Sequence, residues 1–445
     1  MKRLLLICAC IILAASCKKD VISEDPYRLF DDTSLPALTV SISQDEWDRL
    51  LKLYDADNDT KQYVLCDVSL EDGDRSFSVR DAGFRLRGNT SRRRPQSKGS
   101  GKMVHFHAGL HMRKFSETNP SLAGFRRINL KYPKEDPSHI REHYCYDLLS
   151  RYGVWTAPET SWCKLYLNVG AKRYYYGPYL MLESIDKQYV SRRPKFGPGD
   201  GFLWKCGWGA NLKSKDNKLF HYDDNGTASH AYELKDDDAE AFFQAKDQLL
   251  GFITKLNGLQ GDEFKAWIEK VCDVELLLRT YAVNVAVGHW DDYWNNKNNY
   301  YLYFNSRDLE NYRVFMICYD YDNTLGTTKD CGVQRDAGRQ DPYKWGMNEC
   351  PLISKLLSFS DYRDIYTRLL RELGADGNEW FSYGASASRI REWQALIKPF
   401  LDNDTGEDTE LADRPASWGN HGEYRLLEDG TNNWFRVKCR VLNAL

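Results

Sequence analysis

The sequence predicts an α+β fold in which a strand-rich half precedes a helix-rich half. Between residues 38 and 183, most segments alternate apolar and polar side chains, as strands with one buried face do. From residue 237 onward, apolar residues recur every three or four positions over long segments, as in amphipathic helices. The 445 residues are 42% hydrophobic, enough for a sizeable core, and contain no internal repeat. We expect a strand-rich half at 35–210, a polar insertion at 211–235 and a helix-rich half at 236–445.

The strand-rich half contains two segments with helical character. Ser43 and Glu46 form a capping box, so a helix is expected directly after the first strand. A second helix is expected at 138–152, where apolar residues share one face, and a basic loop rich in glycine and serine at 92–102. Strands are expected at 38–42, 63–70, 77–87, 103–110, 128–131, 163–167 and 179–183.

The helix-rich half is interrupted by one pair of strands. Helical patterns at 239–256 and 261–287 precede two short apolar runs at 300–304 and 312–319, which are expected to form a hairpin. Polar residues lie at both outer ends of this hairpin, where a site can form. The remaining helices are expected at 351–358, 362–373 and 386–400.

Residues 1–17 have the features of an export signal. Basic residues precede an apolar run that is too short to span a bilayer as a helix. The small residues directly before Cys17 resemble a bacterial lipobox, which implies cleavage before Cys17 and lipidation of its thiol. The polar segment at 18–34 would then be a tether. We expect an exported protein that is lipid-anchored through Cys17 to the bacterial outer membrane or cell surface.

The charge balance gives no sign of a nucleic-acid partner. The chain has 61 Lys and Arg residues against 64 Asp and Glu residues, a formal net charge of −3. Domains that bind nucleic acid usually carry a basic excess, so no nucleic-acid partner is expected.

Carboxylate and amide side chains gather just before the predicted hairpin. Asparagine is a poor former of helices and of strands, so this composition calls for a separate explanation. These oxygen-bearing side chains either form a polar loop or hold a metal ion and a reacting group. They are Asp291, Asp292, Asn295, Asn296, Asn298 and Asn299.

Asp320 and Asp322 form a second acidic site at the end of an apolar strand. Side chains two positions apart point the same way, and with another oxygen ligand these carboxylates can hold Mg²⁺ or Mn²⁺. Taken alone, the stretch resembles the motif of haloacid dehalogenase phosphatases, in which Asp320 would be the nucleophile and Asp322 the acid/base. That motif opens a parallel α/β domain, whereas about 120 mostly helical residues follow here.

Together, the two acidic sites occur in the order that a protein kinase requires. Asp291 would orient the acceptor hydroxyl, Asn296 or Asn299 would bind one metal ion, and Asp320 with Asp322 would follow after two strands. The sequence resembles the CotH (spore coat protein H-type) kinase family in six motifs, which occur in the family's order. The motifs lie at 84–91, 128–131 with 136–141, 176–186, 201–205, 289–293 with 299–303, and 319–326.

The resemblance implies an atypical, two-lobed protein-kinase-like fold with a strand-rich N-lobe and a helix-rich C-lobe. It implies phosphorylation of exported or surface proteins, at Ser or Thr, with ATP and Mg²⁺ or Mn²⁺. Asp291 would be the catalytic aspartate, and the metal ligands would be Asn299, with Asn296 as the competing choice, Asp320 and Asp322.

The resemblance also implies residues that contact the nucleotide. Arg87 and Gly88 would lie over the phosphates, and Lys102 or Lys131 would be the phosphate-binding lysine. Glu183 would lie near the adenine, and Lys205 would line the cleft. Glu142 stands where many family members carry asparagine, which leaves the ion-pair partner of the lysine undecided.

Two other functions are kept as alternatives. A catalytically silent kinase-like surface lipoprotein would use its aromatic residues, 13% of the chain, to bind glycan or protein. A haloacid-dehalogenase-like phosphatase would form a phosphoenzyme at Asp320. The sequence does not specify the protein substrate.

Overall fold

The computed structural model covers the chain from residue 27 to residue 445 with gaps. The signal and lipidation predictions for residues 1–17, including Cys17, lie outside the described residues. The structure describes 27–89, 91–133, 136–222, 231–235, 239–326, 336–346, 350–401, 411–413 and 424–445.

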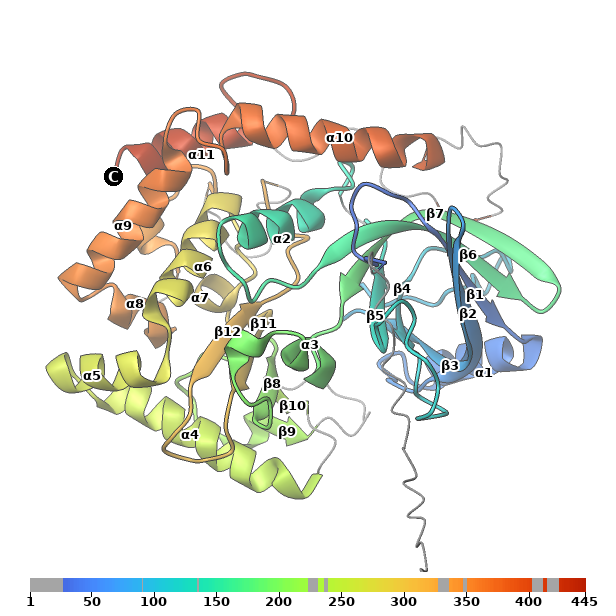
Figure 1. Cartoon of the computed structure of the whole chain (residues 1–445), viewed down its shortest axis with the longest axis horizontal. Coiled ribbons are helices and arrows are strands. Elements are labelled where there is room, and N and C mark those ends of the chain that lie inside the picture. The colour runs from blue at the N-terminus through green and yellow to red at the C-terminus, as the bar shows by residue number, and fades with distance from the viewer. Residues whose placement is uncertain are drawn as a thin grey trace, which may run out of the picture.

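The first part of the chain forms a closed barrel of strands (Figure 1). Neighbouring strands pair antiparallel, except that β1 and β6 pair parallel. Apolar side chains fill the interior, and Leu29 and Phe30, from the segment predicted to be a tether, are buried against the same core. In barrel order the strands are β1 (Ala37–Ile42), β2 (Val64–Asp72), β3 (Arg75–Arg87), β4 (His107–His111), β5 (Arg127–Lys131), β7 (Lys172–Glu183) and β6 (Thr160–Val169).

Two local predictions in the barrel have different outcomes. The capping site is confirmed: the Ser43 hydroxyl accepts a hydrogen bond from the Glu46 backbone N–H at 3.2 Å and caps α1 (Gln44–Ala56). The strand predicted at 103–110 begins only at His107. The Val104 N–H donates to the Pro95 carbonyl at 3.0 Å, so this backbone pairs within its own loop instead of with β3.

A second sheet combines strands from both halves of the sequence. Its strands pair antiparallel, except that β9 and β10 pair parallel. Because β8 precedes the helices and β11 follows them, the sheet crosses the predicted boundary at 211–235. The described residues of that segment supply β9 and β10. In sheet order the strands are β12 (Val314–Cys318), β11 (Tyr300–Phe304), β8 (Phe202–Cys206), β10 (Tyr232–Leu234) and β9 (Phe220–Tyr222).

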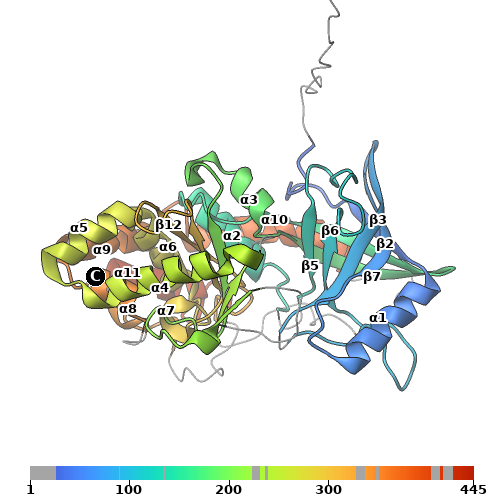
Figure 2. The same cartoon turned by 90° about the horizontal axis from the view of Figure 1, so that it is seen from below.

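Helices surround the second sheet, and α10 extends from them along the barrel (Figure 2). The helix predicted at 261–287 is two helices, because the Asp273 side chain accepts from the Leu276 N–H at 3.0 Å and starts a new one. The mixed α+β class is confirmed. The helices are α2 (Arg141–Arg151), α3 (Lys187–Ser191), α4 (Phe242–Gly258), α5 (Gly261–Val271), α6 (Val274–Val287), α7 (Tyr293–Asn296), α8 (Pro351–Leu356), α9 (Ser360–Gly374), α10 (Tyr383–Leu401) and α11 (Trp434–Asn443).

The helices show no membrane-spanning character. In the described part of the chain, none of them is both long and apolar enough to traverse a bilayer.

A buried ion pair fixes the start of α2. Asp136 accepts from the Ser138 N–H and from the Arg141 N–H, each at 2.9 Å, and its carboxylate also pairs with the Arg141 guanidinium. Arg141 has no exposed surface and Asp136 is 7% exposed. The pair therefore replaces an ordinary N-cap and sets the position of α2.

We expect Asp136→Ala to lower the free energy of unfolding by about 3–5 kcal/mol, because the buried Arg141 charge would lose its carboxylate partner. Urea unfolding followed by circular dichroism measures this loss. The matched control is Asp74→Ala, in the exposed β2–β3 turn, where the change should be within about 0.5 kcal/mol. Equal losses in the two variants would contradict a structural role for the pair.

Candidate active site

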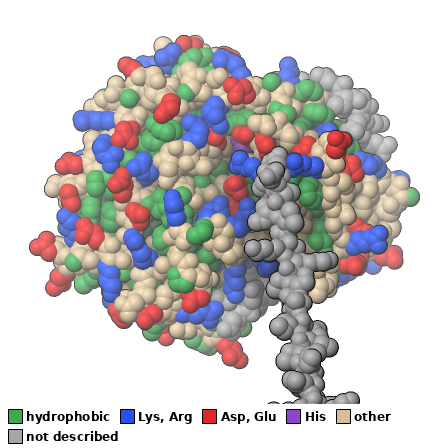
Figure 3. Space-filling view, viewed as in Figure 1, with side chains coloured by type: hydrophobic (Ala, Val, Ile, Leu, Met, Phe, Trp, Pro, Cys, Tyr) green, Lys and Arg blue, Asp and Glu red, His purple; other side chains and the backbone are tan. Residues whose placement is uncertain are grey.

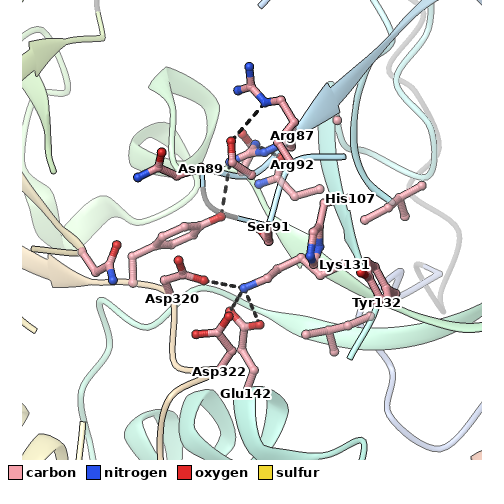
Figure 4. A pocket seen from close by; sticks show the side chains of 18 of the residues that line it. Arg87, Asn89, Ser91, Arg92, His107, Lys131, Tyr132, Glu142, Asp320 and Asp322 are labelled. Atoms are coloured by element: carbon pink, nitrogen blue, oxygen red, sulfur yellow. Dashed lines mark hydrogen bonds and ion pairs between the residues drawn. The ribbon is translucent and has the colours of Figure 1, made fainter. Parts of the chain in front are cut away.

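A cavity of about 480 Å³ is lined by residues of the barrel, of α2 and of the second sheet. It brings together most of the residues that the sequence singles out. Figure 4 shows its centre, where side chains from β3, β5 and α2 meet the residues that follow β12. Asp291, Asn299, Asp320 and Asp322 all line this cavity.

Lys131, the last residue of β5, joins two carboxylates in this cavity. Its ammonium lies 2.6 Å from Glu142 Oε2 and 2.5 Å from Asp320 Oδ1 (Figure 4). Burial alone would lower the pKa of Lys131, but the charges of Asp320, Glu142 and Asp322 raise it well above its usual value. The lysine is therefore a permanent cation. Glu142, which the sequence left undecided, is its partner on α2.

Three asparagines surround the carboxylate of Asp291. Asn296 and Asn298 donate to Oδ1 at 2.5 and 3.1 Å, and Asn299 donates to Oδ2 at 2.9 Å. Burial raises the pKa of Asp291, and the Asp320 charge adds to the rise, while the amide donors oppose it. The asparagines thus fix the orientation of a partly desolvated carboxylate.

Asp292, unlike Asp291, has a structural role. Its side chain accepts from the Asn295 N–H at 2.8 Å, which caps α7, and from Asn284 Nδ2 at 3.2 Å. It has no exposed surface, and burial raises its pKa to about 7. Of the two neighbouring aspartates, only Asp291 faces the cavity.

The β11–β12 hairpin brings the two acidic sites together. The Tyr319 N–H donates to the Asn299 carbonyl at 2.9 Å, so the pairing extends one step beyond the strands. Asn299 and Asp320 both have left-handed backbone, with φ of 54° and 62°. Such conformations are costly outside glycine and cluster at functional sites. The Asp320 N–H is fixed by the Tyr146 hydroxyl of α2 at 3.1 Å.

Asp322 opens into the cavity beside Asp320. Although its side chain is exposed to the open cavity, desolvation by the nearby protein and the Asp320 charge raise its pKa well above 3.8. Among the described residues, no three His, Cys, Asp or Glu side chains form a metal site by themselves. Two carboxylates and the Asn299 amide do offer oxygen donors, which suit Mg²⁺ when a bound phosphate supplies further ligands.

Arg87 lies across the cavity from this acidic group. Its guanidinium donates to Asn129 Oδ1 and, at 3.4 Å, to the Tyr319 hydroxyl. Gly88 follows with φ of 109°, a value that favours glycine. A Cβ at Gly88 would lie 2.6 Å from Ser91 Oγ and 2.7 Å from the Arg92 nitrogen. This tight turn therefore needs glycine.

Most of the remaining predicted site residues do not lie beside the acidic group. Lys205 lines the cavity at its far end, on β8. Glu183 is buried and binds Arg193 at 2.6 Å, and neither Glu183 nor Lys102 lines the cavity. Asn296 holds Asp291 without lining the cavity, whereas Asn299 does both.

The family of the chain follows from its match to protein-family models. The model described as CotH kinase protein matches residues 84–432, which include every cavity residue discussed above. The chain belongs to the CotH kinase family.

Named relatives of this CotH-family chain come from a bacterium and a fungus. It is 27% identical to the inner spore coat protein H of Bacillus subtilis over 316 residues, covering 69% of this chain and 80% of the relative. It is 26% identical over 210 residues to invasin CotH2 of Rhizopus delemar, covering 47% of this chain and 34% of the relative. Invasin CotH3 of the same fungus is 24% identical over 253 residues, covering 55% and 39%. The chain thus spans much less than half of either fungal relative.

We expect Asp322→Asn to stabilise the metal-free protein at neutral pH. The raised pKa means that the wild type loses stability as pH rises from 3.8 through the folded-state pKa, because ionisation costs more in the folded state. The variant removes this loss. In chelating buffer its urea midpoint should exceed that of the wild type at about pH 8, and the gap should close toward about pH 4.

The control for this experiment is Asp55→Asn. Hydrogen bonds from Arg94, and further contacts with Lys98, lower the pKa of Asp55, so its loss should act with the opposite sign. A stability gap for Asp322→Asn that does not change with pH would contradict the prediction.

Proposed function

We propose that the chain is a protein kinase of the CotH type that transfers phosphate from ATP, with Mg²⁺ or Mn²⁺, to exported or surface proteins. One observation carries the proposal: Lys131 is paired with Glu142 and Asp320 in the cavity that Asp291 lines. Protein kinases need a lysine–glutamate ion pair and a metal-binding aspartate in place together. Membership in the CotH kinase family supports the same reaction.

Asp291 would orient a serine or threonine hydroxyl and accept its proton. The amides of Asn296 and Asn298 both donate to Oδ1, whereas the Asn299 amide donates to Oδ2, which leaves a lone pair of Oδ2 for the acceptor. Because the pKa of Asp291 is raised, the carboxylate is a better proton acceptor than an exposed aspartate.

ATP would supply the phosphoryl group, and a divalent cation would neutralise its charge. Asn299, Asp320 and Asp322 would hold the cation through oxygen atoms. Lys131 would hold phosphate oxygens, and Arg87 and the backbone at Gly88 would cover them. Asn299, Asp320, Lys131 and Arg87 are each held by the contacts described above, which limits the rearrangement needed at the moment of transfer.

The barrel with α2 would correspond to the N-lobe of a kinase, and the second sheet with its helices to the C-lobe. The cavity between them supports this proposal. The divisions at residues 210 and 236 stay predictions, since one sheet contains strands from both sides of them.

We place the protein outside the cytoplasm, anchored through Cys17. The basic and apolar pattern of residues 1–17 supports export. The names of the relatives, a spore coat protein and two invasins, fit a family that acts at surfaces.

The phosphatase alternative loses support from the surroundings of Asp320. β12 pairs antiparallel with β11 at the edge of its sheet, whereas that motif belongs at the end of a strand in a parallel sheet.

The mature protein without its lipid cysteine, residues 18–445, tests the proposal when it is incubated with ATP and Mg²⁺ or Mn²⁺ and its intact mass is recorded. We expect phosphate on Ser or Thr, and loss of this addition in Asp291→Ala and Asp320→Ala. An adenylyl adduct would contradict phosphoryl transfer while keeping the site. No adduct, with no metal-dependent binding of ATP, would favour the silent binding protein.

Lys131→Met should lower the phosphorylation rate by about 10²–10³-fold, because one preorganised cation is lost from the transferring phosphate. Rates under saturating ATP measure the effect. Lys98→Met is the matched control, since Lys98 is an exposed lysine whose contact is with Asp55 outside the cavity. A rate unchanged by Lys131→Met would remove Lys131 from the reaction.

A further inference from the structure

The cavity extends from the acidic residues toward β8 and β10. Tyr301 of β11, Lys205 of β8 and Glu233 of β10 lie in register across the second sheet, so they share one face, and all three line the cavity. Strands are spaced by about 4.8 Å, so Lys205, two strands from β12, lies roughly 10 Å from the acidic end.

The side of the barrel that lines the cavity carries basic residues along the same direction, from the acidic end toward β8 and β10. Lys131 of β5 contacts Asp320 at one end, and Arg87 of β3 contacts Tyr319 in the middle. At the far end Lys61, just before β2, lies 3.4 Å from Glu233. The barrel wall and the second sheet therefore face each other across the cavity. The cavity has the acidic residues at one end and the Lys61–Glu233 ion pair at the other.

Positive charge gathers at this far end. Among the described residues that line it, Glu233 is the sole carboxylate. Figure 3 shows acidic and basic side chains mixed over the face in view. We call the following cationic lining residues the basic end: Lys61, Arg85, Arg92, Arg127, Lys205 and Lys235.

The backbone of the barrel is shaped to hold two of the cavity arginines. Gly109 of β4 pairs with Arg85 of β3. A Cβ at Gly109 would lie 2.9 Å from Arg87 Cδ, so a side chain there would displace Arg87, and it would touch Arg85 Nε at an ordinary contact distance of 3.7 Å. Arg85 lies over the Tyr63 ring at 5.2 Å, and its buried Nε has no hydrogen-bond partner in the described structure. A buried donor in this position is ready to bind an acceptor.

The pKa values of Tyr63 and Lys205 reflect the charges around them. Burial would raise the pKa of Tyr63, yet the charges of Arg85, Arg127 and Arg87 lower it. Burial lowers the pKa of Lys205, and the surrounding cations add to this effect against the attraction of Glu233. Asp59 and Asp186 lie 3.8 Å from Arg92 and Arg127, respectively, and Glu233 pairs with Lys61, so three carboxylates face six cations and the basic end keeps an excess of positive charge.

We propose that the basic end is an anion-binding subsite, which takes a phosphate or carboxylate group of a molecule whose other part reacts at Asp291. The group comes either from a negatively charged acceptor or from the nucleotide. Only the reaction at the acidic end rests on the proposed kinase function. The subsite itself rests on the register of the two sheets, the Gly109 space and the charge excess.

Titration calorimetry with inorganic pyrophosphate on residues 18–445 tests the subsite without any catalysis. We expect Lys205→Ala and Arg85→Gln each to weaken binding by about tenfold, the size of one lost charge-assisted contact. Lys213→Ala, an exposed lysine outside the cavity, should bind like the wild type. Glu233→Gln should bind more tightly, because it removes the opposing charge, and unfolding cannot produce that result.

A second titration, into protein saturated with Mg²⁺ and a non-hydrolysable ATP analogue, separates the two sources of the anion. Pyrophosphate binding that persists assigns the subsite to the acceptor, and binding that is competed away assigns it to the nucleotide. Absence of pyrophosphate binding to the wild type, or equal binding by all variants, would overturn the subsite. Loss of kinase activity alone would leave these results unchanged.

Discussion

The ammonium of Lys131 connects three separate parts of the molecule. It lies at the end of barrel strand β5, it pairs with Glu142 of α2, and it contacts Asp320 just after β12. Buried ion pairs add little net stability when compared with apolar packing, but they are strongly specific about position. The main effect of this network is therefore on position, because it holds α2, the barrel and the second sheet in one arrangement around the cavity.

Two supports hold this network in place from outside. The Asp136–Arg141 pair fixes the start of α2, one residue before Glu142. The β11–β12 hairpin fixes Asn299 and Asp320 beside each other, with Asp292 capping the short helix between Asp291 and the hairpin. The abundance of asparagine before β11 follows from this arrangement, because amide donors can hold Asp291 without neutralising it.

Much of this arrangement could be predicted from the sequence, for local reasons. The capping box at Ser43, the hairpin strands and the order of Asp291, Asn299 and Asp320 are short-range patterns, and the structure places the site residues in one cavity. The Lys131–Glu142 pair needed the packing of α2 on the barrel, which no local pattern encodes. The short strands β9 and β10 were hidden because their segment is polar overall, although Phe220 and Tyr232 are buried.

The basic end shows the same limit of sequence reasoning. Arg85, Lys205 and Glu233 come from distant segments, and only the facing of the two sheets brings them together. A scan for charged runs finds Arg92 and its neighbours but not this cluster. The alternation of Arg85 and Arg87 along β3 puts these two arginines on one face, but it says nothing of Lys205 or Glu233.

The way each wall of the cavity is closed has a consequence for how the molecule folds. In the barrel, β1 pairs with β6 through Ala37 and Lys164, and in the second sheet β8 pairs with β11 through Cys206 and Tyr300. Contacts between residues so far apart in the chain require a long loop to be closed, which slows folding. Both walls depend on such a pairing, so no short piece of the chain can form the site alone.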